Sequence, residues 1–142
     1  MPSVSMYFKV HHPFRLKAFN SKEVGAGVCY EDAIADEEAI NNLADECYLP
    51  ANNIILSAIE KSNGAFKVNF SISGVLLDLL QRYRPDVIDS FRALIDTGCV
   101  EILAETYYHS LSFLYSKNEF NRQVEQHSTL IEQLFGVQPQ VF

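Results

Sequence analysis

Alternating apolar and polar residues mark two short stretches of the chain, and each stretch predicts a β-strand. The first strand ends at His11-His12, because Pro13 cannot continue it. A third strand is predicted at 99–103, where apolar residues surround Glu101. The apolar positions of the two alternating stretches are Val4, Met6, Phe8 and Val10, and then Phe66, Val68, Phe70 and Ile72.

Between the predicted strands, apolar residues recur every three or four positions, which indicates helices. We expect a long loop at 14–35 that borders the functional site, and the first residues of a fourth strand at 139–142. The predicted helices start at Asp36, after Pro50, at Gly74 and after Pro85, and a last one spans 117–135.

Strands that alternate with helices imply parallel strands joined by crossovers, so the predicted fold class is α/β, as a sheet or barrel. The length favours a single domain, 1–142. Functional groups in such folds gather at the carboxyl ends of the strands. Three groups of residues fall there, namely His11-His12, Ser73-Gly74 and the polar aromatic segment 105–109.

Glu101 is the most informative residue of the third predicted strand. A buried carboxylate costs several kcal/mol unless it is paired or hydrogen-bonded, so a charge inside an apolar strand needs a reason. Catalysis or sugar binding would supply one, and the aromatic cluster that follows is typical of a carbohydrate site. The structural alternative is an ion pair with Arg15 or another base.

Charge narrows the class of partner. The formal net charge is −7, the pI is near 5.0, and Lys and Arg form no run, so we expect no nucleic-acid partner and no anionic membrane partner. A neutral substrate fits this net negative charge better than an anionic partner does. The N-terminal residues lack the pattern of a secretory signal and no window has the length of a membrane span, which predicts a cytoplasmic protein.

The cysteines and histidines do not have the spacing of a metal site. Cys29, Cys47 and Cys99 are odd in number and far apart, which argues against a disulfide framework and favours buried thiols. His109 and His127 are eighteen residues apart, and His127 falls on the apolar stripe of the last helix. We therefore expect no protein-built metal site and no cofactor.

These motifs resemble glycoside hydrolase family 57, and within it the α-amylase-like members. The family's His-Gln-Pro motif matches His11-His12-Pro13, with His in place of Gln, and its Gly-x-Val-Glu-x motif matches 98–102 without departure. The segments 47–52 and 69–74 also look like those of α-amylase-like relatives. The resemblance spans nearly the whole chain.

The resemblance implies an incomplete seven-stranded β/α barrel, of which this chain would be the N-terminal part. It also implies retaining cleavage or transfer at α-glucosidic bonds, with an α-glucan or malto-oligosaccharide as substrate. The family's nucleophile is a Glu on the fourth strand and its acid/base an Asp on the seventh, so no catalytic residue is expected within this chain. His11 and Glu101 would bind sugar hydroxyls.

Glu101 and Glu105 cannot serve as the catalytic pair, because residues four apart on a strand lie about 13 Å apart along it, while retention needs carboxyl groups about 5 to 5.5 Å apart. Supporting, substrate-binding roles suit both residues better. Tyr107 and Tyr108 either stack on sugar rings or pack at the rim. We expect His11 and Glu101 to face one interior near the carboxyl ends of their strands.

Two other classes of function stay open. One is a non-catalytic carbohydrate-binding or interaction module. The other is a polysaccharide deacetylase, which has a related barrel but needs a close His pair and an acidic residue after the first strand. A barrel cut after three strands leaves an unpaired edge, so self-association through that edge is also expected.

Overall fold

A parallel three-stranded sheet forms the centre of the computed structural model, which describes residues 4–142. The strands are β1 (Met6–Val10), β2 (Val68–Ile72) and β3 (Val100–Ile102), in the order β1-β2-β3. Single backbone hydrogen bonds extend the pairing of β3 on both sides, from Val68 N–H to Cys99 O and from Leu103 N–H to Phe70 O. The predicted α/β class and the parallel pairing are therefore confirmed.

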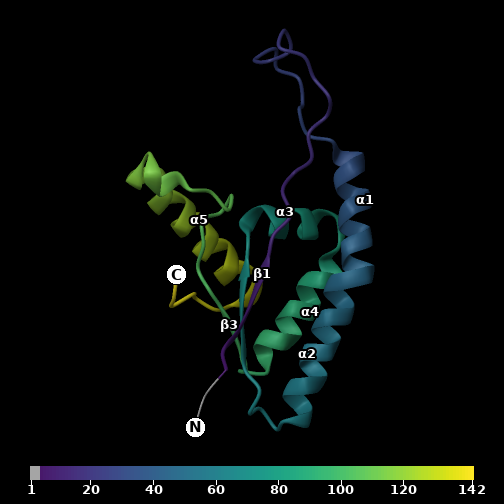
Figure 1. Cartoon of the computed structure of the whole chain (residues 1–142), viewed down its shortest axis with the longest axis vertical. Helices are drawn as coiled ribbons and strands as arrows, with labels where there is room; N and C mark the ends of the chain where they lie inside the picture. The colour runs from purple at the N-terminus through teal and green to yellow at the C-terminus, as the bar shows by residue number, and fades with distance from the viewer. Residues whose placement is uncertain (1–3) are drawn as a thin grey trace.

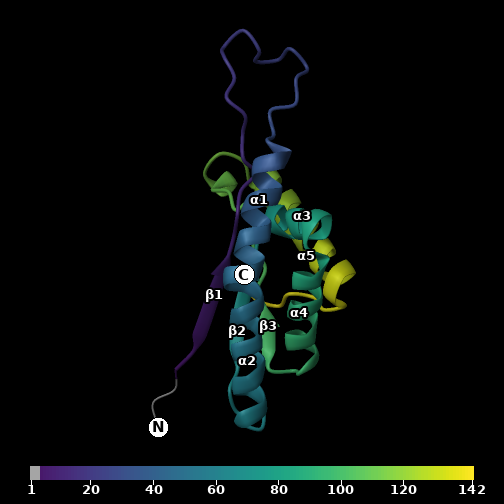
Figure 2. The ribbon, with the colours of Figure 1, turned by 90° about the vertical axis from the view of Figure 1, so that its right-hand side faces the viewer.

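Helices connect the strands and cover one side of them. The chain passes from β1 to β2 through α1 (Ala33–Leu43), η1 (Ala44–Tyr48) and α2 (Leu49–Lys61), and from β2 to β3 through α3 (Gly74–Tyr83) and α4 (Pro85–Asp96). After β3, the short 3-10 helix η2 (Ser112–Leu114) precedes α5 (Lys117–Phe135). Figure 1 shows α1 and α2 running beside the strands, and Figure 2 shows β1 at the outer edge of the molecule.

Pro50 does not separate two helices, in contrast to the prediction. The segments α1, η1 and α2 follow one another without a break, and Leu49 N–H donates to Ala44 O, five residues back. A proline removes one helical hydrogen bond and its ring crowds the preceding turn. The wider π-turn just before Pro50 gives that ring room and lets the helix continue.

The core lies between the sheet and the helices. Alternate strand residues point toward the helices, so that Phe70 packs against Phe8 and against the edge of Phe91 from α4. The opposite face of the strands carries polar residues, among them Lys9 and Ser71. The largest fully buried apolar side chains are Phe91, Ile40, Ile72, Leu76, Leu77, Leu79, Leu80, Leu94, Ile131, Val68 and Val87.

The last helix has the predicted bounds, but the fourth strand does not form. Ser116 caps the start of α5 by accepting from Glu119 N–H, and Gly136 ends it in the left-handed conformation with φ 68°. Residues 139–142 have no assigned strand, although Ala104 N–H donates to Val141 O at 2.7 Å beside the end of β3. One such bond without a ladder leaves this tail irregular.

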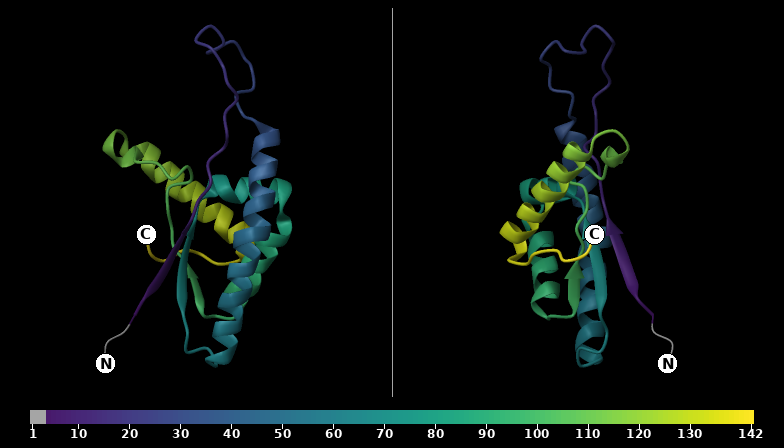
Figure 3. Two further views of the ribbon diagram at one scale, coloured as in Figure 1. Left: turned by 45° about the vertical axis from the view of Figure 1, so that its right-hand side comes forward. Right: turned by 90° about the vertical axis from the view of Figure 1, so that its left-hand side faces the viewer.

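The predicted long loop forms a segment that projects from the molecule, as Figures 1 and 3 show. It starts at the carboxyl end of β1, as expected for a loop that borders a site, but its tip lies away from the sheet. Backbone hydrogen bonds from Lys17 N–H to Tyr30 O and from Asp32 N–H to Arg15 O close its base. Asp32 then caps α1, which therefore begins at Ala33 rather than at Asp36.

The prediction of buried thiols is wrong for two of the three cysteines. Cys29 and Cys47 are exposed and Cys99 is half-buried. Cys29 lies on the projecting segment, and Cys47 lies on the π-turn beside an open cavity. Of the helices that the structure describes, none combines the length and the apolar character that crossing a membrane requires.

Candidate functional site

Six polar side chains meet where the three strands end, and we call them the strand-end cluster. They come from matching positions, because the register pairs Lys9 with Ser71 and the next outward step on the same face brings His11 beside Ser73. Glu105 follows the end of β3 and contacts both Lys9 and Ser71. The strand-end cluster consists of Lys9, His11, Ser71, Ser73, Glu105 and His109.

Glu105 is the buried carboxylate of this cluster, with 6% of its surface exposed. Ser71 donates its hydroxyl to Oε1 at 2.7 Å, and the Lys9 ammonium forms an ion pair with Oε2. Lys9 also donates to Ser71 Oγ at 3.1 Å. Such a closed set of charge-assisted hydrogen bonds compensates for the desolvation of the carboxylate.

Two imidazoles form the outer part of the strand-end cluster. His11 Nδ1 lies 2.7 Å from Ser73 Oγ, which is also the N-cap of α3 and accepts from Leu76 N–H. The ring of His109 lies 4.6 Å from that of His11, centroid to centroid, and its Nδ1 is 3.3 Å from Glu105 Oε2. The rings therefore lie side by side over the buried ion pair.

The surroundings of His11 favour its neutral form. Burial lowers the pKa of His11 below its usual value of 6.5, and the nearby His109 and Lys9 lower it further, while Glu105 acts in the opposite direction. A neutral imidazole offers one donor and one acceptor. That combination suits the hydroxyl groups of a neutral ligand.

Glu101 does not lie where the sequence predicted. The register pairs it with Asn69, which pairs in turn with Tyr7, so Glu101 lies one residue before the end of β3 but at the level of Tyr7, four residues before His11. It is exposed, and no hydrogen bond or ion pair joins it to another side chain within residues 4–142, Arg15 included. Glu105, four residues further along, takes the place beside His11 that was expected for Glu101.

Tyr107 and Tyr108 have different surroundings. Tyr107 is 6% exposed, and its hydroxyl donates to the carboxylate of Asp78 on α3 at 2.7 Å from the nearer oxygen. Its ring packs so closely on Gly74 that a Cβ there would lie 2.5 Å from the ring. Tyr107 therefore cannot stack on a ligand in this structure, whereas Tyr108 is 46% exposed and its ring is accessible.

His127 contributes to the site from α5, although its position on the helix only suggested a core residue. It is fully buried, and its Nε2 lies 2.8 Å from the carbonyl oxygen of Ile72. Since a carbonyl can only accept, Nε2 carries the hydrogen. His127 thereby holds the end of β2 just before Ser73, and burial lowers its pKa.

Sequence reasoning missed two members of the strand-end cluster, Lys9 and Ser71, and singled out Ser73 and His109 only as members of the groups that follow the strands. The signal was present for the strand residues, because Lys9 and Ser71 lie two positions before residues already singled out and so share their face. The contact of His109 with His11 had no such signal, since it depends on the conformation of the turn that carries His109.

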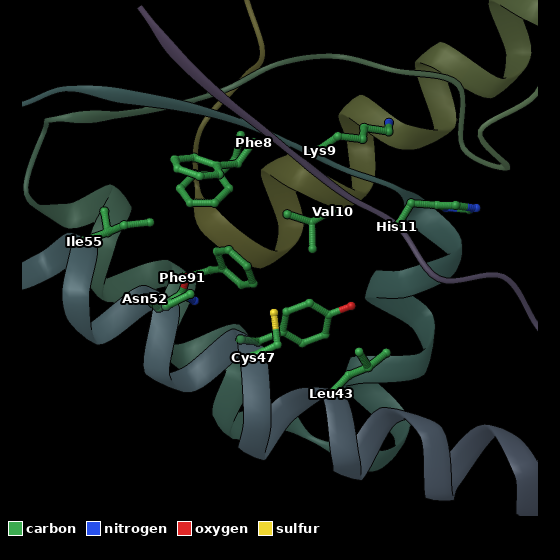
Figure 4. A pocket seen from close by; sticks show the side chains of 12 residues that line it. Phe8, Lys9, Val10, His11, Leu43, Cys47, Asn52, Ile55 and Phe91 are labelled. Atoms are coloured by element: carbon green, nitrogen blue, oxygen red, sulfur yellow. The ribbon is translucent and has the colours of Figure 1, made fainter.

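An apolar cavity of about 320 Å³ lies on the other side of β1, between that strand and the helix around the π-turn. Phe8 and Val10 face it from β1, and Leu43 and Cys47 from the helix (Figure 4). The side chains of Lys9 and His11 extend away from the apolar group, as Figure 4 shows. Lys9 and His11 also line the cavity, so the cavity and the strand-end cluster adjoin one another along one edge strand.

Among the residues that the structure describes, the side chains of the cluster are not arranged as a metal centre. Within residues 4–142, no group of three or more His, Cys, Asp or Glu side chains is placed to hold a metal ion. The available groups are an ion pair, two hydroxyls and two imidazoles, which together can donate to and accept from polar ligand groups.

Comparison with known proteins gives two further observations. The family model described as glycosyl hydrolase family 57 matches residues 5–142. A protein of Methanocaldococcus jannaschii named "Putative alpha-amylase" is 37% identical over 141 residues, which are 98% of this chain and 30% of that protein. The chain thus spans less than a third of the length of this relative.

Two solved structures share the fold. The 4-alpha-glucanotransferase of Thermococcus litoralis matches with a TM-score of 0.67 and 22% identity, over 96% of this chain and 18% of its own. The branching enzyme of Thermococcus kodakaraensis, solved in complex with glucose, matches with a TM-score of 0.65 and 16% identity, over 96% of this chain and 31% of its own. The short coverage agrees with the N-terminal part of a larger barrel, and the chain belongs to glycosyl hydrolase family 57.

Proposed function

We propose that this chain is the substrate-binding N-terminal part of an α-glucan-active, retaining glycoside hydrolase of the α-amylase-like kind. The strand-end cluster is the observation that carries this proposal. Its exposed side presents the imidazoles of His11 and His109 over the ion pair of Lys9 and Glu105, and such hydrogen-bonding groups over a charge-balanced base suit sugar hydroxyls better than an ionic ligand. The similarity to a protein named as an alpha-amylase supports the substrate class.

Within this proposal, His11 binds a sugar hydroxyl at the centre of the site, and Tyr108 provides an aromatic surface at the rim. Glu105 belongs to the binding site through its contact with His109. Glu101 is left with an outlying role, as a ligand for a longer saccharide on the same face of the sheet.

The catalytic carboxyl groups are proposed to lie outside this chain. Retention needs two carboxyl groups about 5 to 5.5 Å apart, one as nucleophile and one as acid and then base. Glu105 is held by Lys9, and Glu101 precedes it by four residues, roughly 13 Å along extended chain. The chain by itself should therefore bind malto-oligosaccharide without cleaving it.

Binding and turnover separate this proposal from its alternatives. Purified chain is titrated with maltoheptaose and, as a mismatched control, with a β-1,4-linked glucan oligomer of similar length, and the same samples are assayed for released reducing ends. We expect saturable binding of maltoheptaose alone and no turnover. The variant His11→Ala should bind more weakly, by about three- to tenfold for one lost hydrogen bond.

The outcomes are distinct. Equal binding of both oligomers, or of neither, would contradict an α-glucan site in this chain. Turnover that Glu101→Gln abolishes would show that a catalytic carboxylate lies within the chain after all.

A further inference from the structure

His109 has an unusual backbone conformation for a residue with a side chain. Its φ is 52°, in the left-handed region that most residues avoid and that Asn, Asp and His enter more often than others. Such conformations cost free energy and persist only where the surroundings enforce them. The turn that carries His109 is therefore the place to look for the forces that do so.

The turn at 105–110 is fixed at several points. Val75 N–H donates to Tyr107 O at 3.2 Å, and His109 N–H donates to Thr106 O at 2.9 Å. Ser110 N–H donates to Thr106 Oγ1 at 2.8 Å. With Tyr107 packed on Gly74 and bonded to Asp78, the turn has little freedom to relax, and it presents the imidazole of His109 toward His11.

Glu105 is poorly placed to bind a ligand itself. Its Oε1 accepts from Ser71, its Oε2 contacts Lys9 and lies near His109 Nδ1, and the side chain is 8% exposed. The side chain of His109 is 49% exposed. Contact with a ligand therefore falls to the imidazole, whose Nδ1 lies 3.3 Å from the carboxylate behind it.

We propose that His109 is a ligand-contacting residue that acts together with His11, and that Lys9, Ser71 and Glu105 form a positioning unit that holds its ring in place. This inference rests on the proposed function and deepens it, because it assigns the face of the site that meets the sugar. A fixed imidazole loses no rotamer freedom on binding and can use its free nitrogen toward a hydroxyl.

The test uses the whole chain, with malto-oligosaccharide as the probe. Imidazole NMR of the free protein should show a ring-to-ring nuclear Overhauser effect between His11 and His109, and maltoheptaose should shift the resonances of both rings. His109→Asn removes the ring but tolerates the left-handed backbone, and should weaken binding by about three- to tenfold. Glu105→Gln should weaken the ring-to-ring effect in the free protein and lower affinity by a similar factor.

A double variant tests whether Glu105 acts through His109. If it does, Glu105→Gln adds little further loss to His109→Asn, because both remove the same interaction. Glu125→Gln, an exposed carboxylate on α5, is the matched control for lost charge and should bind as the unaltered chain does. If Glu105→Gln does not fold because Lys9 is left unpaired, Lys9→Gln/Glu105→Gln replaces the ion pair with two amides.

Each result decides one claim. Full affinity in His109→Asn, while the unaltered chain binds maltoheptaose, would overturn the contact and leave the proposed function standing. A retained ring-to-ring effect in the Glu105 variants would overturn the positioning role. Absence of any binding by the unaltered chain would contradict both the proposed function and the ligand contact. The ring-to-ring effect in the free protein would still test the positioning role of Lys9, Ser71 and Glu105.

Discussion

Gly74 is the residue on which the geometry of the site turn depends most directly. It is the first residue of α3, directly after Ser73 of the strand-end cluster, and it lies under the ring of Tyr107. A side chain at this position would meet that ring at 2.5 Å, which is too close for contact without movement. The absence of a side chain here allows the turn at 105–110 to lie against α3.

Gly74→Ala should therefore destabilise the chain, although alanine is the better helix former. Overpacking of a close contact costs about 1–3 kcal/mol, which exceeds the gain of up to about 1 kcal/mol in helix propensity. Chemical denaturation measures the change in the free energy of unfolding. In a Tyr107→Ala background the same substitution should cost much less, and an equal cost in both backgrounds would show that the ring is not what it meets.

At the residue scale, the sequence predicted which face of the sheet a side chain lies on better than its position along the strand. Period-two alternation placed Glu101 on the same face as His11, and the register puts Glu101 on that face, which also carries Lys9 and Ser71. Alternation is unchanged when a strand slips by two residues, so it cannot say which residues lie side by side. That is why Glu101 was expected beside His11, where Glu105 lies.

Among the elements, α5 is tied to the sheet by one buried polar contact. His127 donates from Nε2 to the carbonyl of Ile72, while its Nδ1 is buried with no hydrogen-bond partner in the part of the chain that the structure describes. Glu105 on the turn after β3 favours the charged form of this imidazole, and Lys9 on β1 opposes it. Burial is the largest effect and keeps the ring neutral.

Stability should consequently fall in mild acid. Burial lowers the pKa of His127 in the folded chain below its usual value of 6.5, so the unfolded chain binds the proton more tightly. The contribution of the neutral ring is complete above about pH 6.5 and is lost progressively below it. Urea midpoints measured from about pH 7.5 down to about pH 5 should fall.

The matched variant is His127→Gln, whose amide can still donate to Ile72 but does not titrate. Its midpoint should fall less steeply over the same range of pH, although His11 and His12, whose pKa values burial also lowers, keep part of the slope. Identical slopes in the two proteins would exclude His127 as a source of the acid sensitivity.

The elements themselves were predictable where periodicity and end signals agreed. The last helix, with Ser116 before it and Gly136 after it, was predicted with the bounds it has. The continuation of the helix through Pro50 was not predicted, because the rule that proline ends a helix applies to a regular α-helix. The wider turn that gives the proline ring room leaves no sign in the residue pattern. The tail at 139–142 has the apolar residues of a strand, but it has no ladder in residues 4–142.

On the scale of the whole molecule, β1 is an exposed edge. Within residues 4–142 it pairs with β2 on one side alone, and Met6 and Tyr7 are 39% and 54% exposed. An unpaired parallel edge with apolar side chains is a template for a second strand. The projecting segment adds further exposed apolar surface, from Leu16, Phe19, Val24 and Val28.

We therefore expect the chain to associate with itself as its concentration rises. Sedimentation velocity should show a growing dimer or larger species, and Met6→Lys should suppress it, because a charge on an edge strand opposes pairing. Ile54→Lys adds the same charge to an apolar residue of α2 that is 70% exposed and should have a smaller effect. A compact monomer at every concentration would contradict the expectation.

The π-turn in the long helix has one more consequence for the molecule. A residue of an α-helix advances the chain by about 100° around the axis, so one extra residue in a turn changes the phase of everything that follows. The single helix packs against α3 along α1 and against α4 along α2, and the turn between them sets the phase that relates the two contacts. Deleting one residue from 44–48 would therefore rotate α2 relative to α1, so correct packing depends on the number of residues in this turn as well as on their side chains.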